Sequence, residues 1–249
     1  MKVTIITVCF NSQDTIEDTI KSVISQTYNN YEYVVIDGGS TDDTNKIISR
    51  YKKYINTFIS EKDVGIYDAI NKGIKKSTGE IVSILHSDDT FYDNKTIQKV
   101  ASYFKSNLSL DCLIGDTIII KKNSQKVIRK YKANFFNKWM LYIGFSPPHP
   151  STFIKKKIYD NYGFYNKNYT IAGDFDFFVR IFLKANINFK IVDENFVLMK
   201  YGGKSTVSIK SNFTSSKEMI KSLKESNLYA NWFFILLRFP IKLIQFIIK

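Results

Sequence analysis

The chain has 249 residues, of which 44% are hydrophobic and 15% aromatic, so it can bury a full core and is not a disordered tail. Its formal net charge of +13 attracts anionic partners, although a compositional bias toward lysine, isoleucine, asparagine and tyrosine explains the excess equally well. Its two cysteines, Cys9 and Cys112, lie in apolar runs without paired spacing, which favours reduced thiols in a cytosolic protein over a disulfide framework or a zinc site.

Strands and helices alternate along the first hundred residues. The N-terminus becomes polar too soon for a secretory signal, so we expect it to be the first strand of the fold. The patterns predict strands at 3–10, 33–36, 56–60 and 81–85, and helices at 15–26, around 47–51, at 67–77 and at 94–104. Such alternation predicts a doubly wound parallel sheet, with ligands bound at the carboxyl ends of the strands. The loops after Phe10, Ile36, Ile59 and Leu85 should therefore converge on one rim.

The chain changes character after Phe91. We expect a hairpin formed by "CLIGDTIII" and "KVIRKY", an aromatic and loop-rich region to Tyr169, and a helix at 173–184. The sequence contains no repeat or low-complexity linker, which favours one domain at 1–210. Its nucleotide-binding half is expected at 1–105 and its acceptor and catalytic half at 106–210, followed by a C-terminal helical segment at 211–249.

Two strand ends carry polar motifs. "VVIDGGSTDDT" places Asp37 at a strand end, and the next residues, Gly38 and Gly39, allow a ligand to approach the backbone. Alone, this stretch is typical of a capped turn, and it lacks the glycine pattern of a dinucleotide or P-loop site. "IVSILHSDDTF" ends a buried strand with Asp88 and Asp89, which indicates either a surface turn or a seat for a hard cation.

The ordered motifs resemble one known family. "TVCFNS", "VVIDGGSTDDT", "EKDVGIYDAINKGI", "HSDD", "PPHPSTF" and "IAGDFDFFVRI" occur in the order typical of the inverting family 2 glycosyltransferases, above all the subgroup of bacterial polysaccharide assembly. The resemblance covers residues 1 to about 205. It implies an α/β GT-A fold: a doubly wound, mostly parallel sheet with a small antiparallel hairpin and a C-terminal amphipathic helical tail.

The resemblance also implies a reaction. A sugar would move from a nucleoside-diphosphate donor, expected to be a UDP-sugar, to the hydroxyl of a glycan or lipid-linked acceptor in cell-surface polysaccharide biosynthesis. Carboxylates beside a diphosphate require a cation, and Mn²⁺ or Mg²⁺ suits their oxygens. Because His86 stands where the family usually has its first aspartate, we expect the metal on Asp89 first and on Asp88 second, with Asp88 also contacting ribose or a water.

The family pattern aligns the general base with Asp174. Asp176 remains a rival, because Gly173 replaces the acid that the family carries before the base. A helix start with dipole-favoured acids is the alternative interpretation. The family's donor-binding positions correspond to Thr7, Phe10, Asn11, Asp37, Gly38, Asp63, Tyr67, Asn71, Lys72 and Asp88.

Two further residues are expected near the reacting groups. His149 matches a histidine often found beside the acceptor, and Lys204 lies in "YGGKST", which resembles a loop that closes over the diphosphate. A packed histidine and an ordinary glycine loop are the alternatives.

The last stretch, "LYANWFFILLRFPIKLIQFIIK", is apolar, but its longest uninterrupted run, 232–237, is too short to span a bilayer. One stripe of polar residues runs along the expected helix, which Pro240 would split: Asn231, Arg238, Lys242, Gln245 and Lys249. This pattern indicates a helix lying in a membrane interface; the alternative is a helix packed on the domain or on a second subunit.

We therefore expect a peripheral enzyme on the cytoplasmic face of a bacterial membrane, without a nucleic-acid partner. One rival is a nucleotidyltransferase of similar fold, but "CFNSQDT" lacks its glycine-rich basic loop. The other rival is a non-enzymatic basic protein that binds lipid or nucleic acid, although no RNA-binding or helix-turn-helix signature is present.

Overall fold

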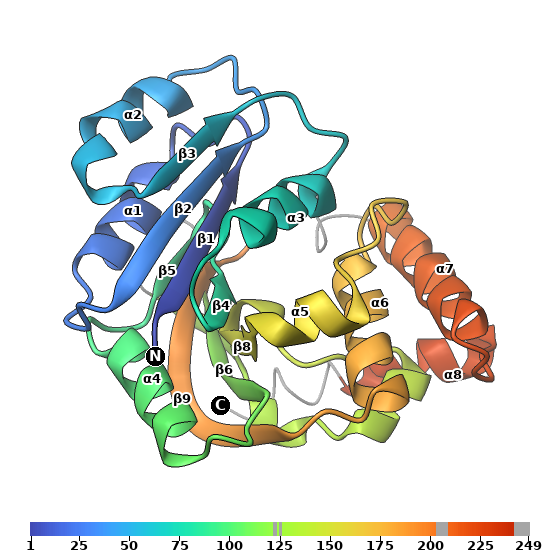
Figure 1. The fold of residues 1–249 in the computed structure, drawn as a ribbon. Helices are drawn as coiled ribbons and strands as arrows, with labels where there is room; N and C mark the ends of the chain where they lie inside the picture. The colour runs from blue at the N-terminus through green and yellow to red at the C-terminus, as the bar shows by residue number, and fades with distance from the viewer. Residues whose placement is uncertain (122–123, 125, 203–208, 242–249) are drawn as a thin grey trace.

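One mixed sheet forms the centre of the molecule (Figure 1). The computed structural model describes residues 1–121, 124, 126–202 and 209–241. Within them the strand order is β3-β2-β1-β4-β8-β6-β9-β5, and β7 pairs with β6. The strands are β1 (Val3–Cys9), β2 (Tyr31–Asp37), β3 (Thr57–Ser60), β4 (Ile81–Ile84), β5 (Asp89–Phe91), β6 (Cys112–Ile120), β7 (Val127–Tyr131), β8 (Thr152–Lys155) and β9 (Phe189–Lys200).

The N-terminal half of the sheet is parallel, as the alternation of elements predicts. Strands β3, β2, β1 and β4 run side by side in one direction, with Cys9 opposite Asp37 and Asp37 opposite Ser60. Alternate side chains of β1 and β2 enter two separate cores on the two faces of the sheet. The carboxyl ends of these strands therefore meet at one rim.

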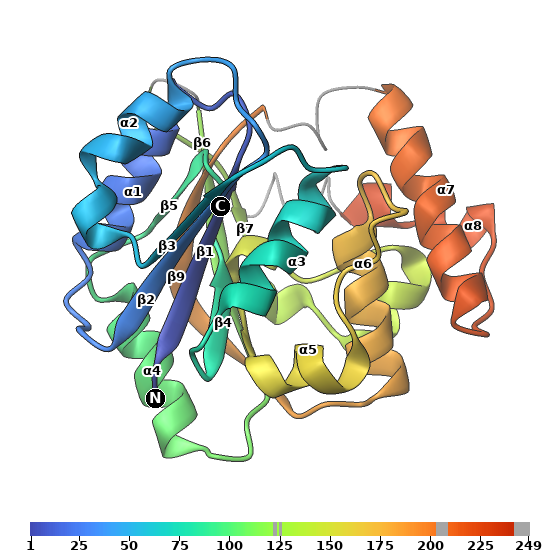
Figure 2. The ribbon, with the colours of Figure 1, turned by 45° about the horizontal axis from the view of Figure 1, so that its top comes forward.

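Helices cover both faces of the sheet (Figure 2). The helices α1 (Ile16–Ile24), α2 (Thr44–Arg50) and α4 (Thr96–Ser106) pack on one face, and α3 (Ile66–Lys76), α5 (Lys156–Tyr162) and α6 (Gly173–Phe178) pack on the other. A π-helical turn, η5 (Val179–Lys184), continues α6 and completes the predicted helix at 173–184. Short 3₁₀ turns lie at η1 (Lys52–Tyr54), η2 (Ala133–Phe135), η3 (Lys138–Ile143) and η4 (His149–Ser151).

The C-terminal half joins the same sheet. The predicted hairpin is present as β6 and β7, but β6 lies inside the sheet, antiparallel to β8 and parallel to β9. Strand β8 inserts between β4 and β6, so 1–105 and 106–210 share one sheet. No pattern predicted β5, β8 or β9: β5 has only three residues, β8 lies in the region expected to be loop-rich, and β9 is interrupted by the polar stretch "DEN".

The segment after residue 208 packs on the domain. It contains α7 (Ile209–Glu225) and α8 (Trp232–Leu236), and the Ser222 hydroxyl of α7 donates to Asp176 of α6 over 2.9 Å. The domain boundary at 210 stays a prediction. Among the described residues, no helix is long and apolar enough to cross a membrane.

Candidate functional site

Hydrogen bonds join the loops at the carboxyl ends of the strands into one rim. Asn11, in the loop after β1, donates its backbone N–H to the Ser40 hydroxyl over 2.8 Å, and its side-chain oxygen accepts from the Thr41 N–H over 2.9 Å. The Ser12 hydroxyl lies 2.9 Å from that of Ser87, which belongs to the loop after β4. The convergence predicted for these loops is therefore present.

Asp37 organises the loop after β2. Its buried carboxylate accepts hydrogen bonds from the Ser40 N–H (3.0 Å), the Ser60 hydroxyl (2.7 Å) and the Asn45 amide (3.1 Å). Burial opposes ionisation, but these hydrogen bonds outweigh it and hold the pKa of Asp37 below its usual value. Because its carboxylate oxygens accept hydrogen bonds from neighbouring residues, Asp37 holds the loop after β2 in place and does not project from the rim.

Gly38 and Asp63 fit against each other. A β-carbon at Gly38 would overlap the Asp63 carboxylate, whose Oδ1 accepts from the Gly65 N–H over 2.9 Å. The Gly38 N–H donates to the Cys9 carbonyl, next to Phe10, whose side chain is 53% exposed. Phe10, Gly38 and Asp63 thus come from three neighbouring loops of the predicted donor side.

Several other predicted donor-binding residues hold the protein together. The Thr7 hydroxyl is buried and accepts from Tyr33, and the Asn71 side chain bonds both the N–H and the carbonyl of Tyr165. Lys72 forms ion pairs with Glu61 at 2.8 Å and Asp68 at 3.4 Å. Thr7 and Asn71 are therefore bonded inside the protein, whereas Lys72 is half-buried among acidic side chains.

The two strand-end aspartates differ in exposure. Asp89 begins β5, is 1% exposed, and its Oδ1 has no hydrogen-bond partner among the described residues; Asp88 is half-buried. Burial, and then the charge of Asp88, raises the pKa of Asp89 well above its usual value. A carboxyl group in this position is stabilised either by binding a proton or by a nearby cation.

His86 and His149 stack behind these aspartates, with ring centroids 5.7 Å apart. The Nε2 atom of His149 lies 2.9 Å from the Tyr165 hydroxyl. Burial, and then the neighbouring His86, lowers the pKa of His149 to about 3. His149 is therefore a buried, neutral ring packed against His86. This agrees with the alternative interpretation of the sequence, a packed histidine.

Tyr67 extends this row of rings to α6. Its ring stacks on that of Tyr165 at 5.8 Å, and its hydroxyl donates to the Ile171 carbonyl over 2.6 Å. Burial, and then the charge of Asp174, raises the pKa of Tyr67. The rings of His86, His149, Tyr165 and Tyr67 thus connect the strand-end aspartates to the start of α6.

The two aspartates of α6 have different surroundings. Asp176 is 5% exposed, and its oxygens accept from the Arg180 Nε at 3.1 Å and the Ser222 hydroxyl at 2.9 Å. Asp174 is half-buried in the first turn, where its Oδ1 accepts from the Phe175 N–H over 2.8 Å. Asp176 therefore stabilises the fold, and Asp174 is the more accessible carboxylate of the motif.

Sequence reasoning missed Glu218. From α7, its carboxylate accepts from the backbone N–H groups of Thr170, Ile171 and Ala172 at 2.8–2.9 Å, and so fixes the chain that leads into α6. No local signal identifies this role, because Glu218 lies on an expected surface helix remote in sequence from these partners. Lys204, the predicted loop residue, lies outside the described residues.

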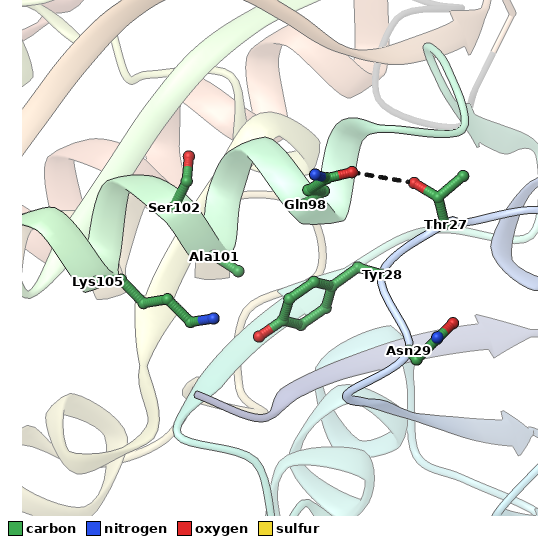
Figure 3. A pocket seen from close by; sticks show the side chains of 7 residues that line it. All are labelled: Thr27, Tyr28, Asn29, Gln98, Ala101, Ser102 and Lys105. Atoms are coloured by element: carbon green, nitrogen blue, oxygen red, sulfur yellow. Dashed lines mark hydrogen bonds between the residues drawn. The ribbon is translucent and has the colours of Figure 1, made fainter.

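A surface cavity of about 310 Å³ lies at the other end of the sheet (Figure 3). It is lined by Thr27, Tyr28 and Asn29, which precede β2, and by Gln98, Ala101, Ser102 and Lys105 of α4. No predicted site residue contributes to it. The cavity is therefore separate from the rim.

The sequence profile described as "Glycosyl transferase family 2" matches residues 4–178, which include both strand-end motifs and the start of α6. The chain belongs to glycosyl transferase family 2. A "PGL/p-HBAD biosynthesis glycosyltransferase" of Mycobacterium bovis (strain BCG / Pasteur 1173P2) is 28% identical over 66% of the chain. The matched region is 62% of that relative's length, so the chain spans about three-fifths of it.

Other relatives match different lengths of the chain. An uncharacterized glycosyltransferase of Mycobacterium tuberculosis (strain CDC 1551 / Oshkosh) is 30% identical over 72% of the chain and 68% of its own length. The poly-beta-1,6-N-acetyl-D-glucosamine synthase of Staphylococcus epidermidis is 33% identical over 47% of the chain and 28% of its own length.

Solved structures confirm the GT-A-like α/β fold. S. aureus TarS 1-349 in complex with UDP-GlcNAc matches with a TM-score of 0.69 and 20% identity, over 90% of this chain and 66% of that one. The mannosyltransferase PcManGT from Pyrobaculum calidifontis, in complex with GDP-Man and Mn²⁺, matches with a TM-score of 0.66 and 16% identity, over 90% and 63%.

Within this family 2 fold, the described residues hold no preformed metal cage: nowhere do three or more His, Cys, Asp or Glu side chains gather as one. A cation at the strand-end aspartates would need further ligands, and the phosphate oxygens of a bound donor are of the right kind. The unpartnered Oδ1 of Asp89 and the adjacent Asp88 carboxylate fit such a shared site.

Proposed function

We propose that this family 2 chain transfers a sugar from a nucleoside-diphosphate donor to an acceptor hydroxyl with inversion, and that Asp174 is the general base. The observation that carries the assignment is that both carboxylate oxygens of Asp176 accept hydrogen bonds within the protein, one from Arg180 and one from Ser222. Asp174 is the half-buried carboxylate of the same motif, and its charge acts on Tyr67, which belongs to the row of rings behind the rim.

The reaction follows from the placement of this base. Asp174 would accept the proton of the acceptor hydroxyl as its oxygen attacks the anomeric carbon from the face opposite the diphosphate. The bond between that carbon and the phosphate oxygen breaks, the diphosphate carries away the electron pair, and the configuration at the carbon inverts. Glu218 would position the base, because it fixes the backbone that enters α6.

A divalent cation, Mn²⁺ or Mg²⁺, fits beside Asp88 and Asp89. When bound, it would neutralise the charge of the departing diphosphate. The exposure of the two carboxylates supports Asp88 as the principal ligand, because Asp89, at 1% exposure, cannot reach a diphosphate on the rim without moving. This order reverses the one expected from the sequence.

The donor would lie along Phe10, Asn11, Gly38 and Asp63, and we infer a UDP-sugar. The complex of TarS with UDP-GlcNAc supports this choice, although PcManGT was solved with GDP-Man. We further infer a glycan or lipid-linked acceptor of the bacterial cell surface, and the similarity to a poly-beta-1,6-N-acetyl-D-glucosamine synthase supports a glycan. We accordingly place the reaction at the inner face of the cell membrane, without a nucleic-acid partner.

Thermal unfolding of the full chain with a panel of UDP- and GDP-sugars, each with and without Mn²⁺, tests the proposal. A bound donor at a hundredfold excess over its Kd stabilises the folded state by about 2.7 kcal/mol, so the Tm rises. We expect the largest rise with a UDP-sugar and Mn²⁺ together, and none with UMP and Mn²⁺. A rise with free nucleoside triphosphates and none with nucleotide sugars would instead indicate a nucleotidyltransferase.

A further inference from the structure

Helix α8 turns its apolar side away from the protein. Of its side chains and those just after it, Trp232 is 41% exposed, Phe233 69%, Leu236 47% and Leu237 37%, while Ile235 is fully buried. A helix on the surface of a globular domain has the opposite arrangement, with its apolar stripe toward the core. Phe234 is also exposed, at 38%, so apolar side chains cover most of the circumference of α8, and Ile235 points into the protein.

Of the polar stripe predicted from the sequence, Arg238 faces the protein. Arg238 is 1% exposed, and its guanidinium donates to the Ser216 hydroxyl at 3.0 Å, the Asn212 carbonyl at 3.3 Å and the Met219 sulfur. The Asn231 side chain caps α8 by accepting from the Phe234 N–H over 3.0 Å. These contacts fix the rotation of α8, which is why its apolar side faces outward. Lys242, Gln245 and Lys249 lie outside the described residues.

Aromatic residues next to α8 enlarge its apolar surface. Phe213 of α7 is 60% exposed and stacks on Trp232 with ring centroids 5.2 Å apart. Tyr229, in the turn between the two helices, is 72% exposed and packs edge-on against Phe234. We call the surface formed by Phe213, Tyr229, Trp232, Phe233, Leu236 and Leu237, together with the exposed lysines of α7, the α7–α8 face.

The exposed side of α7 is basic. Lys217, Lys221 and Lys224 follow Phe213 at helical spacing and are all exposed, as is Lys210 one turn earlier. Of the acidic residues of α7, Glu218 binds backbone N–H groups, and Glu225 accepts from the Tyr169 hydroxyl over 2.8 Å and forms an ion pair with Lys221 at 3.7 Å. Among the described residues, this leaves Lys210, Lys217 and Lys224 as the lysines of α7 without an ion pair to a carboxylate of that helix. The apolar surface therefore adjoins a row of positive charge.

We propose that the α7–α8 face docks on an anionic lipid bilayer, with its aromatic and leucine side chains in the interface and its lysines at the headgroups. Exposed Trp, Phe and Leu beside lysine are the composition of interfacial helices, and the lysine row complements anionic headgroups. A protein partner or a second copy would explain the apolar side chains but would not call for the lysines. The proposal goes beyond the sugar transfer and does not depend on it.

The position of the α7–α8 face determines which side of the rim would lie near the membrane. In Figures 1 and 2, α7 and α8 lie at the edge next to α6 and far from α1 and α2. Because Glu218 joins α7 to residues 170–172, docking would hold the start of α6 on the membrane side of the molecule. Acceptors carried by the bilayer would then approach the α6 side of the rim.

Co-sedimentation of the full chain with phosphatidylcholine vesicles, with and without 30% phosphatidylglycerol, tests the proposal. We expect binding to the anionic vesicles and its loss at about 1 M salt, where the Debye length is about 3 Å. Phe233→Ser with Leu236→Ser should lower the partition coefficient at least about tenfold. Leu108→Ser is the matched control, because Leu108 is 73% exposed on another part of the molecule.

The charge requirement has its own pair of variants. Lys217→Gln with Lys224→Gln should weaken binding to anionic vesicles about 25-fold, at about fivefold per lysine. Lys46→Gln with Lys52→Gln removes two exposed lysines near α2 and should change it little. Circular dichroism and Tm establish that each variant folds. Absence of vesicle binding, or a dimer in light scattering that Phe233→Ser with Leu236→Ser dissociates, would overturn the proposal in favour of a protein interface.

Discussion

The ring of Tyr67 occupies the space in which a side chain at Gly173 would stand. A β-carbon at position 173 would lie 2.7 Å from two atoms of that ring, closer than real β-carbons approach. The Tyr67 hydroxyl donates to the Ile171 carbonyl, so the ring cannot move without loss of this bond. Glycine stands where the family usually carries an acid because tyrosine fills the volume, and the entry to α6 is fixed by packing.

Gly173→Ala tests this packing. Alanine is the better helix former by about 1 kcal/mol, so a surface exchange would stabilise the protein. Here we expect a loss of about 1–3 kcal/mol in the free energy of unfolding, measured with urea, because the methyl group overpacks the Tyr67 ring. Combined with Tyr67→Leu, the exchange should cost less than it does alone. Additive effects of the two substitutions would mean that the ring and residue 173 do not interact.

Asp174→Asn and Asp176→Asn should separate catalysis from stability. Loss of the base lowers kcat by about a hundredfold to ten-thousandfold, while the donor Kd and the Tm stay near those of the unchanged protein. Asp176→Asn should instead lower the free energy of unfolding by about 1.5–3 kcal/mol, because it weakens charged hydrogen bonds with Arg180 and Ser222. Steady-state kinetics, donor titration and urea unfolding measure the three quantities.

One further variant controls for the positioning of the base. Ser222→Ala removes a partner of Asp176 without touching Asp174 and should reproduce part of the stability loss with kcat nearly unchanged. If Asp176→Asn abolishes turnover in a protein of unchanged Tm, then Asp176 is the base and the assignment of Asp174 is wrong.

The parallel half of the fold was predictable, because each of its elements carries its own periodic signal. Burial on both faces makes β1 and β2 mostly apolar, and the polar residues that follow them then identify the rim. The roles of individual residues were harder to predict from the sequence. Glu218 and Arg238 act through partners remote in sequence, and the opposite environments of Asp88 and Asp89 come from a three-residue strand that no periodicity can reveal.

Acidification should remove the stability that the protein gains by holding His149 and His86 neutral. Burial lowers the pKa of His149 to about 3 and also lowers that of His86, whereas the unfolded chain takes up these protons near pH 6.5. The contribution of His149 is therefore lost as the pH falls below 6.5, by about 1.4 kcal/mol between pH 7.5 and 5.5, and the contribution of His86 changes in the same direction. Urea unfolding at these two pH values measures the loss.

Asp89 acts in the opposite direction, because its raised pKa makes the folded state bind a proton that the unfolded chain releases. Comparison with His149→Gln isolates the histidine, since the contribution of Asp89 is common to both proteins. We expect the variant to lose about 1.4 kcal/mol less than the unchanged protein over the same interval. Equal losses would show that His149 is not held neutral in the folded state.

The order of the two metal ligands can be decided without an assay of transfer. Electron paramagnetic resonance measures the binding of Mn²⁺ in the presence of a UDP-sugar. Loss of an outer-shell partner weakens metal binding roughly tenfold to hundredfold, and we expect Asp88→Asn to weaken it by more than that. Asp89→Asn should weaken it within that range and leave the metal-free Tm unchanged or higher. The reason is that asparagine matches the shape of the carboxyl group but cannot ionise. Burial raises the pKa of Asp89 because it disfavours the charged carboxylate, and asparagine has no such charged form. Retained Mn²⁺ binding in Asp88→Asn and its loss in Asp89→Asn would restore the order expected from the sequence, and would require the Asp89 side chain to leave its buried position when the donor binds.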